Sequence, residues 1–197
     1  METEKNISNI EESLEIINKM IFTAKVNIKG GSFYFLFWGW LIILISLGVF
    51  SLEKFTNMMN SEVLWSLTFV GVIVSGIYGY KKEKKEKFTT YTGNIYMWVW
   101  LGFLIVVAGL IFIIIYDKAY TLIGPVILLL AGYATLLSGI IIKFKPLIIG
   151  ALFMWTLGIT AFFIHNEYAL IVEAFAVLCG YLIPGYMLKN KKDDENI

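Results

Sequence analysis

Glu173 is the residue of this sequence whose type and position most clearly suggest a chemical role, because it is a carboxylate inside the long apolar run 168–188. It is the only acidic residue placed well within such a run. An ionisable group at the centre of a bilayer costs roughly 2.5–3.5 kcal/mol on insertion scales, and less toward the interface. Such a group usually faces the interior of a helix bundle, pairs with another residue, or lies on a proton or ion path. The alternative is that the Glu173 side chain reaches the outer headgroups and only anchors its helix.

The rest of the sequence lacks the residue sets that catalysis or metal binding require. His165 is the only histidine, which excludes a His-pair metal site, and its neighbours Asn166 and Glu167 add only weak ligands. The chain has no arginine, hence no bidentate clamp for a phosphate or carboxylate. It has no Gly-rich phosphate loop and no Ser or Cys nucleophile near a plausible base. We therefore expect no enzyme activity, no catalytic residue, no cofactor and no bound metal.

The elements that must position Glu173 are membrane-spanning helices. Apolar residues make up 58% of the chain and the mean hydropathy is +0.75, well outside the soluble range. A helix needs roughly 20 apolar residues to cross a hydrocarbon core of about 30 Å, and in lipid a segment must satisfy its own backbone hydrogen bonds. The sequence predicts an all-α fold, an integral membrane bundle of six transmembrane helices preceded by one cytoplasmic amphipathic helix. The six predicted spans are Phe33–Leu52, Leu64–Tyr80, Ile95–Tyr116, Leu122–Ile142, Pro146–Ile164 and Tyr168–Leu188.

The lysines between these spans predict the orientation. Fourteen of the 16 lysines lie in the N-terminal segment, the second and fourth connections and the tail, while the outer connections hold only Lys54 and Lys118. Short cytoplasmic loops carry an excess of Lys and Arg. We expect a multi-pass protein of the cell (cytoplasmic) membrane with its N-terminus and C-terminus in the cytoplasm. Its domains are a cytoplasmic helix at 1–31, a six-span domain at 32–188 and a charged cytoplasmic tail at 189–197.

The segment before the first span has the pattern of an amphipathic helix. Ser8 and Glu11 fit a capping box at its start, and Gly30-Gly31 ends it. Its apolar residues are spaced four and three apart, as in a heptad stripe. This stripe could lie on the inner membrane surface, pair with a partner or with itself, or pack under the protein's own inner loops. The residues that we consider for partner docking are Ile10, Leu14, Ile17, Ile21 and Ile28.

The second connection is a candidate site for lipid headgroups. Its lysines adjoin the inner leaflet, where each contributes about 1 kcal/mol of attraction to anionic lipid. The alternative is that they serve only to set the topology. These lysines are Lys81, Lys82, Lys84, Lys85 and Lys87.

Small residues and prolines mark places where the spans pack or bend. The second span has a small residue at every fourth position: Gly71, Ser75 and Gly79. Such a row of small residues, called here a packing seam, lets another helix approach closely. Pro125 and Pro184 could kink the fourth and sixth spans. Trp38 and Trp40 match two later tryptophans at an offset of sixty, which indicates either an internal duplication or a chance match of low-complexity apolar sequence. The later tryptophans are Trp98 and Trp100. A second seam, in the fourth span, consists of Ala131, Thr135 and Gly139.

The N-terminal residues also resemble a known family. Glu12-Ser13-Leu14, Ile16-Ile17, Met20-Ile21 and Asn27, followed by an aromatic run ending in Trp38-Gly39, look like the opening of an uncharacterised family of small bacterial multi-span membrane proteins. The resemblance covers about the first forty residues. It implies a multi-span topology and a gene often placed beside that of a small winged-helix DNA-binding regulator, but it implies no activity.

From these observations we expect a non-enzymatic interaction or regulatory protein that docks a partner through its N-terminal helix. The alternative is a small proton- or ion-coupled transporter or channel that uses Glu173. The expected partners are the lipid bilayer and a cytoplasmic protein or a second copy of the chain, with no direct contact to nucleic acid.

Overall fold

The structure is a computed structural model that describes residues 31–55, 61–85, 91–164 and 167–194. The described part is almost entirely helical and contains no strand. It begins with the helix Gly31–Phe55, called here the 31–55 helix. The elements that follow are η1 (Ser61–Ser66), α2 (Leu67–Lys85), α3 (Tyr91–Tyr116), η2 (Tyr120–Leu122), α4 (Ile123–Ile141), α5 (Lys145–Phe162), α6 (Tyr168–Val177), η3 (Leu178–Leu182) and α7 (Ile183–Asp194).

Six helical segments of the described residues are long and apolar enough to cross a membrane. Each predicted span overlaps one of them, with ends that differ by at most three residues, so the number, type and place of these helices are confirmed. The segments are Gly31–Phe55, Val63–Lys81, Gly93–Tyr116, Tyr120–Ile141, Lys145–Phe162 and Tyr168–Asn190. The amphipathic helix predicted before residue 30 lies outside the described residues.

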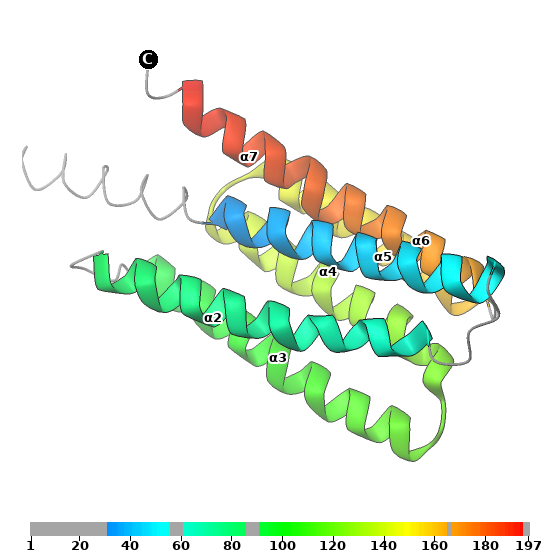
Figure 1. The fold of residues 1–197 in the computed structure, drawn as a ribbon. Coiled ribbons are helices and arrows are strands. Elements are labelled where there is room, and N and C mark those ends of the chain that lie inside the picture. Colours follow the sequence, from blue (N-terminus) through cyan, green and yellow to red (C-terminus); the bar gives the residue numbers. More distant parts are fainter. Residues whose placement is uncertain (1–30, 56–60, 86–90, 165–166, 195–197) are drawn as a thin grey trace, which may run out of the picture.

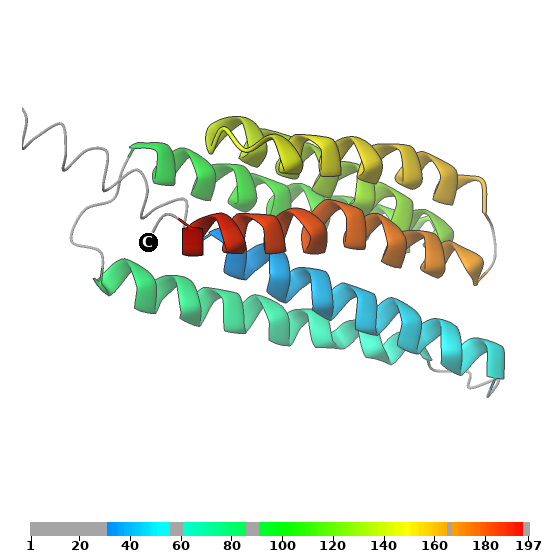
Figure 2. The same cartoon turned by 90° about the horizontal axis from the view of Figure 1, so that it is seen from above.

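The helices run up and down along a common direction (Figure 1). The 31–55 helix lies between α2 on one side and α6–α7 on the other, and α4 and α5 pack together on the far side of α6–α7 (Figure 2). Helices α2 and α3 overlap in Figure 1 but lie on opposite sides of the 31–55 helix and α7 in Figure 2. At one end of the bundle lie the start of the 31–55 helix, the end of α2, the start of α3, the α4–α5 connection and the end of α7.

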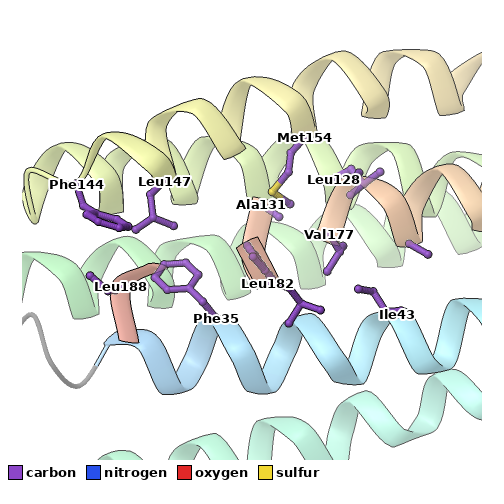
Figure 3. Close-up of a cluster of buried hydrophobic side chains, with 13 residues drawn as sticks. Phe35, Ile43, Leu128, Ala131, Phe144, Leu147, Met154, Val177, Leu182 and Leu188 are labelled. Carbon is purple, nitrogen blue, oxygen red and sulfur yellow. The ribbon is translucent and has the colours of Figure 1, made fainter. Parts of the chain in front are cut away.

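The buried core lies between the 31–55 helix and α4, α5, α6 and α7. Figure 3 shows large side chains from these helices meeting in that space, among them Phe35, Leu147 and Met154, which are almost completely buried. Helices α2 and α3 bury very few residues: in the most apolar stretch of each, 6% and 0% of the residues are buried inside the protein. Exposed apolar side chains on these two helices suit contact with lipid, where association between helices has no hydrophobic driving force.

Both predicted packing seams are confirmed. In α2, Gly71 faces Leu41 and Trp38 of the 31–55 helix, and a Cβ at Gly79 would lie 3.0 Å from the Tyr34 hydroxyl. Ser75 accepts a hydrogen bond from Trp38 Nε1 at 3.0 Å. The seam of α4 packs on α5, where a Cβ at Gly139 would lie 3.0 Å from the Ile148 amide nitrogen.

The match at an offset of sixty does not extend to the packing. Trp38 is partly buried and bonded to Ser75, whereas its counterpart Trp98 is 61% exposed. Ser138, which begins the same Ser-Gly-Ile triplet as Ser75 at an offset of 63, donates its hydroxyl proton to Ala134 O in its own helix at 2.7 Å. The matched residues of the first two spans and of the third and fourth spans therefore lie in different surroundings.

The two prolines lie at different positions in their helices. Pro125 lies in the first turn of α4, where its missing N–H would have no partner within the helix. Pro184 follows the π-helical turn η3, in which the Ile183 amide donates to Leu178 O, five residues back. Because Pro184 cannot donate to the carbonyl four residues before it, a shifted hydrogen-bond pattern at this point has a direct cause.

Candidate functional site

Glu173 lies in the second turn of α6 and is buried, with 6% of its surface exposed. Its carboxyl group packs against Gly124 in the first turn of α4, where a Cβ added at Gly124 would overlap the Glu173 Oε1 atom. The carboxyl group therefore occupies space that only a glycine at this position leaves open. Among the described residues, the Glu173 side chain thus lies against α4 and is mostly buried.

The Glu173 carboxyl has no ionic or hydrogen-bond partner among the described residues. Lys54, at the end of the 31–55 helix, pairs with another acid. Its Nζ lies 2.9 Å from Glu167 Oε1 and 5.0 Å from the centre of the Tyr168 ring. This hydrogen bond from Lys54 lowers the pKa of the Glu167 carboxyl. The pair joins the end of the 31–55 helix to the start of α6 and leaves Glu173 uncompensated.

The position of Gly124 gives the Glu173 carboxyl one favourable feature. Helix α4 begins at Ile123, so the carboxyl lies at its N-terminal end. Aligned peptide dipoles give this end of a helix a partial positive charge, which favours an anion nearby. The site can thus tolerate a carboxylate better than plain hydrocarbon can.

Ser46 is a second polar residue at about this height in the bundle. The 31–55 helix runs antiparallel to α6 and α7, as the contacts of Gly39 with Leu182 at one end and of Lys54 with Glu167 at the other show. Ser46 lies between these contacts, within about one helical turn of the height of Glu173 at 1.5 Å rise per residue. Its side chain is fully buried, and its hydroxyl has no hydrogen-bond partner in the part of the chain that the structure describes.

A second group of buried polar atoms lies nearer the Lys-rich end. The Tyr181 ring lies 5.6 Å from the ring of Phe35 and 6.4 Å from that of Trp100. Trp100 and Tyr96 also belong to this group, with 6.3 Å between their ring centres. Tyr181 lies eight residues beyond Glu173, roughly 12 Å along the helix. Apolar residues of α6 separate the two groups, namely Ala174, Ala176 and Val177.

The other predicted site residues are only partly described. Lys81 and Lys84 are exposed at the end of α2, where they border a hollow of about 610 Å³ with Tyr80. Lys82 and Lys85 belong to α2, but their side chains are not described, and Lys87 lies outside the described residues. The candidate docking residues of the N-terminal helix also lie outside, and they are Ile10, Leu14, Ile17, Ile21 and Ile28.

Sequence reasoning missed Ser46 and Gly124. A serine in an apolar run carries no signal by itself, because a helical Ser can bond to its own backbone. A glycine that accommodates a carboxyl from a helix about fifty residues later can be found only from tertiary structure. In the described residues, no group of three or more His, Cys, Asp or Glu side chains could hold a metal ion.

Comparison of the chain with protein-family models, curated proteins and solved structures gives no match.

Proposed function

We propose that the chain is a multi-pass protein of the cell membrane in which Glu173 reversibly binds a proton or a small cation, as in a small proton- or ion-coupled transporter or channel. One observation carries this proposal: the Glu173 carboxyl is buried against Gly124 with no cationic partner among the described residues. No residue set for catalysis accompanies it, so the proposed protein is not an enzyme.

The membrane location and the orientation are part of the proposal. Six long apolar helices support the location, and the described lysines support the orientation. Lys54 and Lys118 lie at one end of the bundle, while five others lie at the opposite end: Lys81, Lys84, Lys143, Lys145 and Lys189. Reporter enzymes fused after Lys145 should read cytoplasmic, and those fused after Asn166 should read external. A cytoplasmic signal at Asn166 would contradict the orientation.

Proton or cation binding follows from the cost of the isolated charge. A carboxylate inside a bilayer is stabilised by taking up a proton, by binding a cation, or by neighbouring dipoles. The N-terminal end of α4 supplies dipoles to Glu173, and Ser46 supplies a hydroxyl oxygen at a similar height. Charged and neutral states of Glu173 are then close enough in free energy for a ligand to exchange.

The test is flux in reconstituted vesicles under an imposed proton, sodium or potassium gradient. We expect wild-type protein to dissipate one of these gradients and Glu173→Gln to abolish the flux, because the amide keeps the shape but cannot titrate. Glu167→Gln is the matched control: it removes an acid of the same sequence region, paired with Lys54, and should retain the flux. Absence of flux in the wild type under every gradient, or undiminished flux in Glu173→Gln, would contradict the proposal.

A second function, partner docking by the N-terminal helix, is favoured by the four-and-three spacing of its apolar residues. Fully burying an Ile or Leu side chain is worth about 1.5–3 kcal/mol, so this stripe requires a covering surface. Replacing Leu14 and Ile17 with Asp should abolish recovery of a cytoplasmic protein or of a second, differently tagged copy. Lys19→Asp, on the opposite face of the helix that the sequence predicts, should leave recovery unchanged. Equal recovery with the double variant would reject docking.

A further inference from the structure

The 31–55 helix carries an apolar groove on its side that faces away from the core. The groove has a volume of about 580 Å³ and lies where this helix is flanked by α2 and α7 (Figure 1). The 31–55 helix forms most of its lining, including Leu36, Leu41 and Leu44, while α2 contributes Tyr78 and α7 contributes Lys189. A volume of this size is within the usual range of ligand sites, about 300–1,000 Å³.

Contacts between neighbouring side chains hold the walls of this groove in place. The ring of Phe33 stacks on that of Tyr78, with 3.8 Å between the ring centres. Trp40 Nε1 donates a hydrogen bond to the Tyr186 hydroxyl at 3.1 Å, which ties the indole to α7. These contacts join the 31–55 helix to both flanking helices, so the groove does not depend on a ligand for its shape.

The polar and apolar residues of the groove are sorted along its length. Ser32 and Lys189 lie at the Lys-rich end of the bundle, and Leu44 lies twelve residues farther along the 31–55 helix. Twelve residues span roughly 18 Å of helix, close to half of a hydrocarbon core of about 30 Å. A ligand that fills the groove therefore has a polar head at the membrane surface and an apolar tail one leaflet long.

Lys189 determines the charge of that head. Its side chain is exposed, and no described acidic residue forms an ion pair with it. A lysine ammonium binds phosphate as a point charge. Every glycerophospholipid has an anionic phosphate and acyl chains about one leaflet long, but an unneutralised lysine favours those whose headgroup carries no ammonium of its own, the anionic phospholipids.

We propose that this groove binds one anionic glycerophospholipid, with its phosphate at Lys189 and one acyl chain along Leu36, Leu41 and Leu44. The site is separate from Glu173, which lies in the core nearer the opposite end of the bundle. It rests on the proposed membrane location but not on the flux proposed for Glu173. Binding measured in detergent therefore fails or succeeds independently of that flux.

The first test is native mass spectrometry of the full chain in detergent with phosphatidylglycerol or phosphatidylcholine added. We expect wild type to bind one phosphatidylglycerol in preference, and Lys189→Gln to weaken that binding about fivefold, which corresponds to about 1 kcal/mol for one lysine. Lys143→Gln, an exposed lysine at the same end of the bundle but outside the groove, should change nothing. No preference for phosphatidylglycerol, or an equal loss in both variants, would overturn the proposal.

A second test locates the acyl chain and does not depend on Lys189. Phosphatidylglycerol with brominated chains quenches tryptophan fluorescence on contact, and at about one lipid per protein it should quench Trp40 in the groove. The quenched component should disappear in Trp40→Phe and persist in Trp98→Phe, because Trp98 is exposed on α3 away from the groove. Quenching that is lost in Trp98→Phe or kept in Trp40→Phe would place the lipid elsewhere.

Discussion

The contact between Glu173 and Gly124 can be tested by a substitution whose effect should depend on the residue at 173. In the wild type, a methyl group at 124 would overlap the Glu173 carboxyl, so this buried side chain would have to move. Forcing extra volume into a packed interior typically costs about 1–3 kcal/mol. With alanine at 173 the overlap is absent, and Gly124→Ala should then carry only the smaller cost of a Cβ on the residue before Pro125, because a proline ring disfavours helical backbone at the preceding residue.

The assay is thermal unfolding of the purified protein in detergent for the four members of this double-mutant cycle. At about 2–4 °C per kcal/mol for a chain of 150–250 residues, Gly124→Ala alone should lower Tm by roughly 2–12 °C. In the Glu173→Ala background the same change should lower Tm much less. The coupling between the two sites should fall in the range of about 0.5–3 kcal/mol found for residues in contact.

Gly102→Ala is the control for this cycle, because a Cβ at Gly102 would meet nothing within 4 Å. It should be neutral or slightly stabilising in both backgrounds. If Gly124→Ala proved equally harmless with glutamate and with alanine at 173, the carboxyl would not occupy the space beside Gly124, and the reasoning about the site would be refuted.

Two further predictions concern the ends and the middle of α6–α7. Because Lys54 lowers the pKa of Glu167, their ion pair should stabilise the fold at neutral pH and lose this effect as pH falls through the pKa of the folded state. The Tm of the wild type should thus be slightly higher than that of Glu167→Gln at about pH 7, and the two values should converge near pH 3. A difference that grew on acidification would contradict this prediction. Gly150→Ala should lower Tm, because its Cβ would lie 3.0 Å from both Cys179 O and Gly180 Cα, backbone atoms that cannot rotate away. An unchanged Tm would show that α5 and the turn η3 can separate without cost.

The sequence predicted the helices well because the signals that define them are local. Runs of apolar residues fix each span by their length, and the small residues at Gly71, Ser75 and Gly79 predict a seam by their four-residue spacing alone. The structure supplies the partner of that seam, Trp38 and its neighbours on the 31–55 helix. Which helix fills a seam depends on how the loops arrange the spans, and spacing does not encode this.

The candidate site was predictable only in part, for a related reason. Glu173 is conspicuous as an acid in an apolar run, but its contact with Gly124 joins two helices whose approach no local pattern specifies. Pro184 signals an interrupted helix, whereas the close approach of the π-helical turn before it to Gly150 of α5 is a tertiary contact that no local pattern specifies. The groove beside Lys189 likewise exists only because α2 and α7 flank the 31–55 helix.

Infrared spectroscopy of the Glu173 carboxyl tests the proposed proton or cation binding most directly. Difference spectra of wild type and Glu173→Gln, in lipid vesicles from about pH 4 to pH 9 with and without sodium or potassium, isolate the bands of this one side chain. We predict a carbonyl band of a protonated carboxylic acid that converts to carboxylate bands as pH rises or as the bound cation is added. A Glu173 spectrum that stays the same across the whole pH and salt series would contradict the account, because a group that never exchanges its ligand can couple to no gradient.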